Sequence, residues 1–394
     1  MNFRLGRLFA GLAVVALTVA VPASAKDRIK IGMLTTLSGS SAEIGQDMVD
    51  GFNLGIKNAG GKLGGLPVEV VTGDDQAKPD TGRQIAEKMV ERDGVDVITG
   101  TIFSNVFQAM YKPVLDAGVF IIAPQAHLHT LAGKECNANF IMLGTQSDNY
   151  AESTGAYAKK AGYKRVYVLA PNYAAGKAVV TGFKRQYDLP LAGEALPAFG
   201  QLDFAAEIAQ IRATKPDAVY VFMPGGMGLA FLKQYAASGM MKEAPHLAGW
   251  AAYDPSTLAA VGDAALGAIG TTDWNPDMKY PSSEKFVKDF MAAYKRPPSH
   301  YAAMAYEVTL LLDVAVKQVN GKIEDKKAFS QALRTVKFDS LRGPNFKLNT
   351  NGFPIADHYV IRVVKGPDGK PMTQLGEIAI AGLKDPYVAE CPMK

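Results

Sequence analysis

Cysteine, long apolar runs and an excess of either charge are all scarce in this chain. It has two cysteines, Cys136 and Cys391, among 394 residues, and its formal net charge is only +4. A charge so small and evenly spread gives no reason to expect nucleic acid or an anionic membrane as a partner. After the N-terminus, no apolar stretch approaches the roughly 20 residues that span a bilayer. We therefore expect no membrane insertion.

The sequence also lacks the motifs of enzymes and metal sites. A glycine-rich stretch after the first predicted helix does not have phosphate-loop spacing, and no G-x-S-x-G motif occurs. His127, His129 and Cys136 match no known metal-ligand spacing. Asp74 and Asp75 follow a predicted strand, where turn and capping hydrogen bonds explain two adjacent acids. We therefore expect no catalysis, no cofactor and no metal ion.

The first 25 residues have the pattern of a secretion signal. Arg4 and Arg7 precede an apolar run over residues 8–21, and Pro22-Ala23-Ser24-Ala25 supplies the small residues of a cleavage site. No cysteine sits at the cleavage point, so we expect no lipid anchor. The mature chain, residues 26–394, is then predicted to leave the cytoplasm and stay in solution.

Export to an oxidising compartment would allow the two cysteines to form a disulfide. In an oxidising compartment a pair of cysteines indicates one disulfide, here between Cys136 and Cys391, which would tie the C-terminal tail to the body. Two free thiols are the alternative. We favour the disulfide because Cys391 lies three residues from the chain end, where a cysteine has little other use.

Short β-rich runs alternate with segments whose apolar residues have helical spacing. This alternation predicts α/β architecture, with parallel sheets flanked by helices. The predicted strands are Ile29–Leu34, Val68–Thr72, Val95–Thr99, Val119–Ala123, Arg165–Ala170, Asp217–Met223 and His246–Trp250. The predicted helices are Glu43–Asn58, Thr81–Arg92, Asn105–Leu115, Tyr150–Ala161, Gly226–Ala237, Ser282–Tyr294 and Tyr301–Val319. Strands at Phe346–Leu348, His358–Val364 and Gly376–Ile380 are expected to form an antiparallel edge.

The pattern runs through the chain twice, which predicts two lobes. After a signal peptide over 1–25, we assign 26–146 and 274–350 to lobe one, and 147–273 and 351–394 to lobe two. In an open α/β sheet, ligands bind beyond the carboxyl ends of the strands. Two such lobes facing each other would place these loops across a single cleft.

In lobe one, two loops after strands offer polar groups to that cleft. Phe103, Ser104 and Asn105 lie where a helix begins, and a hydroxyl beside free backbone N–H groups at a helix N-terminus suits a carboxylate. The alternative is that Ser104 only caps its helix. The next loop, with Gln125 and Ala126, can add a backbone N–H and a polar side chain.

The loops of lobe two contribute Tyr173, Met223 and Trp250. Both tryptophans of the chain, Trp250 and Trp274, fall at a predicted strand end or lobe crossing. Aromatic rings at such positions can stack on a planar ligand. Packing between the lobes is the alternative, and it is about equally expected for Trp274.

In order and spacing, a set of residues spread along the chain resembles one known family. The mature chain is similar to the periplasmic binding proteins for branched-chain amino acids and related solutes, the soluble receptors of ATP-driven (ABC) importers. The markers are Ile29-Lys30-Ile31-Gly32, Leu37-Ser38-Gly39, Gly45, Gly51, Asn58-Ala59-Gly60-Gly61, Gly64, Asp74-Asp75, Pro79, Gly100, Ser104 and Pro124. The resemblance implies a type I clamshell of two α/β lobes joined by three hinge crossings, located in the periplasm and usually monomeric.

The resemblance also implies site residues. Family members for aliphatic amino acids hold the ligand α-carboxylate with a Ser at a helix start, matched here by Ser104. They add an Ala backbone group and a Thr hydroxyl after the next strand; Ala126 matches, whereas His127 replaces the Thr. A lobe-two Tyr in the family is matched by Tyr173.

Two departures from the family pattern bear on the ligand. The Glu that meets the α-ammonium is replaced by Trp250, and the next acid, Asp254, is expected to cap a helix. A family Tyr that packs on the ligand is replaced by Ile44. Because a buried ammonium without an anionic partner costs several kcal/mol, we expect a carboxylate without an α-amino group. An aromatic acid of the benzoate or cinnamate type suits Ile44 and Trp250 best.

The expected mechanism is closure of the two lobes on the ligand, followed by delivery to a membrane permease. Hinges are predicted near Gly144–Asn149, Ile269–Trp274 and Asn349–Asp357. Alternatives are a branched-chain amino acid, an amide or a urea-like solute as ligand, or a sensory receptor role for the same clamshell. An enzyme is the weakest alternative.

Overall fold

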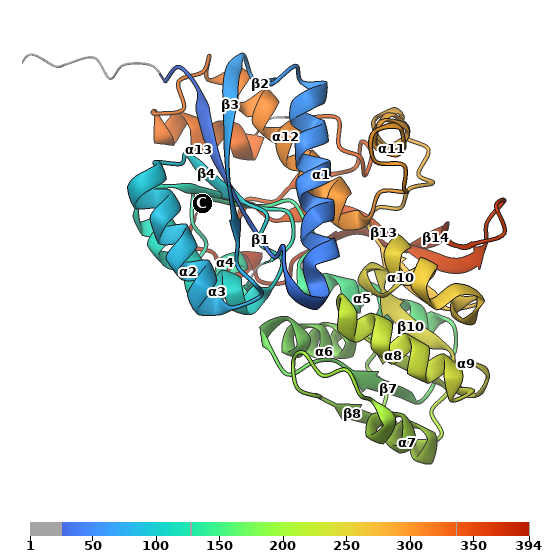
Figure 1. Ribbon diagram of the computed structural model, residues 1–394. Helices are drawn as coiled ribbons and strands as arrows, with labels where there is room; N and C mark the ends of the chain where they lie inside the picture. Colours follow the sequence, from blue (N-terminus) through green and yellow to red (C-terminus); the bar gives the residue numbers. More distant parts are fainter. Residues whose placement is uncertain (1–25, 127, 336, 394) are drawn as a thin grey trace, which may run out of the picture.

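The computed structural model describes residues 26–126, 128–335 and 337–393. Two bodies are visible in Figure 1, each built on its own β-sheet. We call the body on the first sheet lobe one and the body on the second sheet lobe two. The predicted signal segment, 1–25, lies outside the described residues.

The sheet of lobe one has the order β2-β3-β1-β4-β5-β6. All neighbours in it are parallel except β2 and β3, which form a hairpin. The strands from β1 to β6 are Ile29–Thr35, Lys62–Leu63, Leu66–Asp74, Val97–Thr99, Phe120–Ala123 and Phe140–Met142. Strands β4 and β5 are buried along their whole length, as the continuous apolar runs of central parallel strands require.

Helices from both ends of the sequence belong to lobe one. They are α1 (Ala42–Asn58), α2 (Pro79–Lys88, continued by a π-helical turn at Met89–Asp93), α3 (Ser104–Asp116), α4 (His129–Ala132), α11 (Pro281–Tyr294), α12 (His300–Gln318) and α13 (Lys326–Thr335). Helix α1 lies against α12 (Figure 1). A Cβ atom on Gly51 of α1 would lie 2.0 Å from the carbonyl oxygen of Ala302. Only glycine permits this close approach of the two helices.

The sheet of lobe two has the order β12-β13-β11-β10-β9-β7-β8, with β14 beside β13. The strands from β7 to β14 are Val166–Leu169, Gly193–Ala195, Ala218–Val221, His246–Gly249, Ile269–Thr272, Lys347–Leu348, Pro354–Lys365 and Pro371–Lys384. Strands β7 to β11 pair in parallel, and β11 to β14 pair antiparallel through β13. The predicted antiparallel edge is therefore confirmed, and Ile269–Thr272 of a predicted hinge is a regular sheet strand.

The helices of lobe two are α5 (Ser147–Lys160), α6 (Ala174–Gln186), α7 (Ala205–Thr214), α8 (Gly226–Ala237), α9 (Met240–Glu243) and α10 (Pro255–Val261). Short 3₁₀ helices lie at Gly39–Ser41, Trp250–Tyr253, Gly262–Ala265 and Val388–Glu390. The predicted two-sheet α/β architecture is confirmed. The residue boundaries of the lobes and the number of hinge crossings stay predictions.

A disulfide joins Cys136 to Cys391, as predicted, and closes a loop over 255 residues of sequence separation. The tail that it holds also contacts lobe two, because the Tyr387 hydroxyl donates to Asp148 Oδ2 at 2.7 Å. Arg185 pairs with the same carboxylate at 3.0 Å. The C-terminal tail is thus attached to elements of both lobes.

A fully buried ionic network lies where the chain passes between the lobes. At its centre is Asp273, whose Oδ1 lies 2.6 Å from His300 Nε2 and whose Oδ2 accepts from Arg342 Nη1 at 2.9 Å. Thr145 also donates to Asp273, and Arg342 also pairs with Glu307. Burial opposes ionisation, but His300 and Arg342 hold the pKa of Asp273 well below its usual value. Every carboxylate oxygen in this network has a partner.

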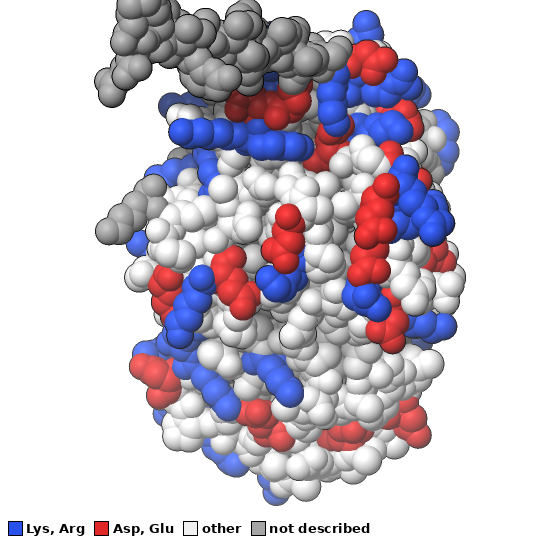
Figure 2. Space-filling model, turned by 90° about the vertical axis from the view of Figure 1, so that its left-hand side faces the viewer, with Lys and Arg blue, Asp and Glu red and all other residues white. Residues whose placement is uncertain are grey.

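The outer surface carries charges of both signs. On the face shown in Figure 2, Lys and Arg side chains alternate with Asp and Glu. Ion pairs one helical turn apart occur on α2 and α3, such as Arg83–Glu87 at 2.8 Å and Lys112–Asp116 at 3.3 Å. Within the described part of the chain, no helix combines the length and the apolarity needed to cross a membrane.

Candidate ligand-binding cleft

Two small cavities lie between the lobes, and they share Ala251 and Tyr301 in their walls. The first, which we call the serine cavity, has a volume of about 10 Å³ and is lined by Ile102, Phe103, Ser104, Gln125, Ala126, Ser147, Tyr173, Ala175, Phe222, Pro224, Ala251 and Tyr301. The second, which we call the acid cavity, has about 90 Å³ and is lined by Ser40, Glu43, Ile44, Gly225, Gly226, Leu229, Ala251, Asp254, Ser256, Thr257, Ala260 and Tyr301. The lobes are closed on each other, and a ring-sized ligand enters only when they separate.

Ser104 lines the serine cavity and is the first residue of α3, not the residue before it. Phe103 occupies the N-cap position, and no side chain makes a capping hydrogen bond there. The alternative role of Ser104, that it only caps its own helix, is therefore not what the structure shows. Ser104 is 4% exposed, and it lies beside the backbone N–H groups that the first turn of a helix leaves unpaired. This end of the cavity is built to receive negative charge.

The loop after β5 contributes differently from what we expected. Gln125 and Ala126 both line the serine cavity. The Ala126 N–H, however, donates to the carbonyl oxygen of Thr101 at 3.1 Å. It therefore fixes the loop and is not a free donor for a ligand. His127 lies outside the described residues.

Aromatic rings from both lobes meet beside Ser104. Tyr173, the residue before α6, lines the serine cavity as predicted, and its ring lies 4.7 Å from that of Phe199. Phe199 in turn packs edge-on against Phe103 of lobe one at 5.4 Å. Burial raises the pKa of Tyr173 well above its usual value, so its hydroxyl stays protonated. Phe199 was not predicted, because it lies in a loop without regular periodicity.

Four other predicted site residues have different positions. Ile44 lines the acid cavity. Asn105 lies in the first turn of α3, outside both linings, and its Oδ1 is buried without a partner. Met223 packs in the core of lobe two, whereas its neighbours Phe222 and Pro224 line the serine cavity. This is the alternation of an extended chain, in which adjacent side chains point to opposite faces.

Trp250 is the fourth, and it lies behind the cleft. Its ring stacks on His300 with centroids 4.0 Å apart and meets Tyr301 edge-on at 4.6 Å. Tyr150 covers another side at 5.6 Å. Trp250 belongs to neither cavity lining. In this closed form it supports Tyr301, the residue that does face both cavities.

Asp254 caps α10, as expected, but with only one of its oxygens. Oδ1 accepts from Ser256 N at 3.1 Å and from Ser256 Oγ at 3.0 Å. Oδ2 is buried without a partner, and the residue lines the acid cavity. Burial first, and then the negative charge of Asp47, raise the pKa of Asp254 to about 7.

A pair of glycines allows the lobes to close at the acid cavity. Gly225 and Gly226 of lobe two lie against Ser40 and Ser41 of lobe one. A Cβ atom on Gly226 would lie 2.9 Å from the Ser40 Cβ, and one on Gly225 would lie 2.9 Å from the Ser41 Oγ. Larger side chains at these positions would hold the lobes apart.

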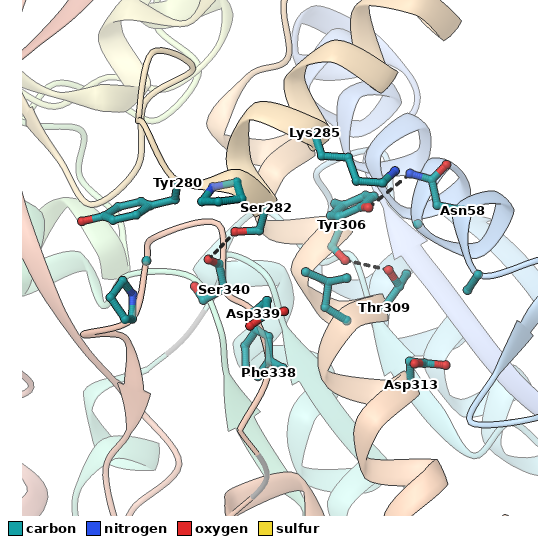
Figure 3. Close-up of a pocket in the computed structure, with 16 residues that line it drawn as sticks. Asn58, Tyr280, Ser282, Lys285, Tyr306, Thr309, Asp313, Phe338, Asp339 and Ser340 are labelled. Atoms are coloured by element: carbon teal, nitrogen blue, oxygen red, sulfur yellow. Dashed lines mark hydrogen bonds between the residues drawn. The ribbon is translucent and has the colours of Figure 1, made fainter.

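A larger cavity of about 650 Å³ lies elsewhere, within lobe one. Figure 3 shows its walls, formed by α1, α11, α12 and the segment 338–344, with Asn58 bonded to Tyr306 and Ser282 bonded to Ser340. No residue of lobe two lines it among the described residues. A ligand there would not connect the lobes, so we place the ligand site in the cleft.

Two α/β lobes closed on a cleft with a helix N-terminus and aromatic walls define the class of extracytoplasmic solute-binding proteins. Residues 28–369 match the family model "Periplasmic binding protein", and the chain belongs to this family. Among curated relatives, Leu/Ile/Val-binding protein homolog 6 of Brucella melitensis is 25% identical over 369 residues, covering 91% of this chain and 93% of that protein.

Solved structures with the same fold include receptors of ABC transporters bound to aromatic acids. A solute-binding protein from R. palustris in complex with benzoate is 31% identical, with a TM-score of 0.87, and covers 93% of this chain and 99% of that one. Another, from Rhodopseudomonas palustris BisB5 with 3,4-dihydroxybenzoic acid, is 26% identical, with a TM-score of 0.86 and coverage of 92% and 99%. The predicted family and the type I fold are thereby confirmed.

Proposed function

We propose that this protein is the receptor of an ABC importer for a small aromatic carboxylate, which it binds between its lobes and delivers to a permease. The composition of the serine cavity carries this proposal. Ser104 and the start of α3 supply a site for a carboxylate, and rings of Phe103, Tyr173 and Tyr301 surround it. Among the described residues that line this cavity, none is Asp or Glu.

The missing acid favours an aromatic acid over an α-amino acid. In an α-amino acid the carboxylate and the ammonium sit on one carbon, so a carboxylate at Ser104 would place the ammonium in the same cavity. Without an anionic partner, a desolvated ammonium costs several kcal/mol. The benzoate bound by the R. palustris relative supports the same ligand class. The Leu/Ile/Val-binding relatives keep leucine as the principal rival.

A thermal-shift screen of residues 26–394 tests the proposal. Benzoate, cinnamate, their hydroxylated forms, aliphatic acids, leucine, isoleucine and valine would each be added at increasing concentration. A ligand that binds only the folded state raises the melting temperature as its concentration exceeds the dissociation constant. We expect stabilisation by aromatic acids and none by leucine. Stabilisation by leucine alone would show that the proposed ligand class is wrong.

A further inference from the structure

Asp254 uses one carboxylate oxygen for structure and leaves the other free. As an N-cap it needs only Oδ1, which accepts both hydrogen bonds from Ser256. Oδ2 is buried and has no partner, and the residue as a whole is only 8% exposed. A buried acceptor left unpaired costs free energy. A Ser would cap the helix without a second carboxylate oxygen to pair.

The surroundings of Asp254 make a donor the suitable partner for the free oxygen. It lines the acid cavity together with the exposed Glu43 of lobe one. The buried Asp47, also of lobe one, is already occupied by Arg296. Both acids face Asp254 from α1 and add negative potential to that of its own carboxylate. A group that donates a hydrogen bond is therefore favoured in this cavity, and an acceptor is not.

The acid cavity lies next to the serine cavity, not within it. Ala251 and Tyr301 line both cavities, whereas Ser104 lines only the serine cavity and Asp254 only the acid cavity. A ligand whose carboxylate is held at Ser104 reaches Asp254 only with its far end. A flat ring lying along Tyr301 has the rigidity to span both cavities and to carry a donor at that end.

We infer that Asp254 determines specificity by accepting a hydrogen bond from a hydroxyl or amino group on the ligand ring, at the end remote from the carboxylate. This inference rests on the proposed function. It narrows the ligand class from aromatic acids in general to aromatic acids that carry a donor on the ring. Closure of the lobes then pairs the one free oxygen of Asp254.

Calorimetric titration of residues 26–394 with four acids tests this role. Benzoate is the reference, 4-hydroxybenzoate and 4-aminobenzoate carry a donor, and 4-methoxybenzoate carries only an acceptor. The 3-substituted isomers are titrated in parallel, to allow for either ring position. We expect the preferred donor compound to bind about tenfold more tightly than its methoxy analogue, because the methoxy compound leaves Asp254 Oδ2 unpaired. Comparison of the hydroxyl and amino compounds shows which donor fits.

The variant Asp254→Asn tests the role of the free oxygen separately from that of the oxygen that caps the helix. Asn keeps the helix cap, because its carbonyl oxygen accepts from Ser256, and it replaces the free oxygen by a donor amide. We expect this variant to lose the preference for donor compounds, measured as the ratio of the affinities for the donor compound and for its methoxy analogue. Asp203→Asn is the matched control, since Asp203 accepts from Ala205 N at 3.1 Å in the same kind of turn but is exposed on lobe two.

The outcomes separate this inference from the proposed function. If no aromatic acid binds, the proposed function is wrong and the inference is wrong with it. If aromatic acids bind but donor and methoxy compounds bind equally, only the role of Asp254 is overturned, and this measurement needs no variant. An undiminished donor preference in Asp254→Asn overturns it as well.

Discussion

Two buried polar regions of this protein differ in whether both oxygens of their carboxylates are paired. In the buried ionic network around Asp273, both oxygens of Asp273 and both oxygens of Glu307 have partners. These are supplied by His300, Thr145, Arg342 and the segment 340–341. In the cleft, Asp254 Oδ2 has none. Both regions are shielded from water, so the difference is not one of exposure.

Under the proposed role of Asp254, the difference separates a carboxylate that holds the fold from one that pairs with a ligand. A buried charge is tolerated when its partners are built into the chain, as at Asp273. A buried acceptor without a partner lowers the stability of the closed form, and a ligand that pairs it removes that cost. Pairing within the chain therefore distinguishes the two regions better than residue type, since both depend on an aspartate. Four experiments test this distinction.

The largest effect on stability is expected in the buried ionic network around Asp273. Arg342→Met leaves the carboxylates of Asp273 and Glu307 buried without their countercharge, and we expect the free energy of unfolding to fall by about 3–5 kcal/mol. Urea denaturation of residues 26–394 measures it. Arg362→Met is the control: its bidentate pair with Glu377 is about half exposed, and a loss below about 1 kcal/mol is expected. An equal loss of stability in the two variants would show that the buried network contributes no more than an exposed ion pair.

Closure of the cleft is the next target. Gly226→Leu places a side chain where Ser40 already lies, so the lobes stay apart, and we expect affinity for an aromatic acid to fall by about tenfold or more. Ala237→Leu, at the exposed end of the same helix, is the control. Unchanged affinity in Gly226→Leu, measured by calorimetry, would show that closure does not bring these surfaces together.

Loss of the carboxylate contact should have a similar or smaller effect. Ser104→Ala removes a hydroxyl that lines the serine cavity, and we expect affinity for benzoate to fall by about tenfold. Ser282→Ala makes the same change in the larger cavity of lobe one, where Ser282 donates to the Ser340 carbonyl. It should leave binding unchanged. If Ser282→Ala weakened binding and Ser104→Ala did not, the ligand site would lie in the larger cavity of lobe one.

The smallest expected effect is a dependence of closure on pH. In the closed form burial raises the pKa of Asp254 to about 7 and that of Asp47 to about 6. The pKa of an exposed Asp is about 3.9. Between these values the closed form binds more protons than an open form, so lowering the pH favours closure. Small-angle X-ray scattering without ligand should give a smaller radius at pH 5 than at pH 8. Asp254→Asn should weaken this response; an unchanged response would exclude Asp254 as its source.

Sequence patterns predicted the elements well where periodicity was strong. The continuous apolar run at Val119–Ala123 became β5, and the spacing in Gly226–Ala237 matched α8 to the residue. The adjacent acids Asp74 and Asp75 accept turn hydrogen bonds from Gln76 and Ala77, as expected. Helix α6 was missed because its two glycines and its run of small and β-branched residues weaken a helical pattern.

Candidate site residues were predictable where position along a strand or helix decides the outcome. Ser104 and Tyr173 follow strands at the carboxyl edge of their sheets, and both line the serine cavity. The orientation of Trp250 could not be foreseen, because it depends on His300 and Tyr301, which arrive from a distant helix. Phe199 and the free oxygen of Asp254 depend likewise on contacts between segments far apart in the sequence.

The sequence by itself determined the order of strands and helices, the family and the pairing of two cysteines, because local periodicity and the chemistry of export act on residues near one another or on the composition as a whole. Tertiary structure alone decided which buried polar groups are paired. Pairing depends on distances between segments far apart in the sequence, so two aspartates that look alike in the sequence differ in the structure. Both oxygens of Asp273 have partners, whereas Oδ2 of Asp254 has none.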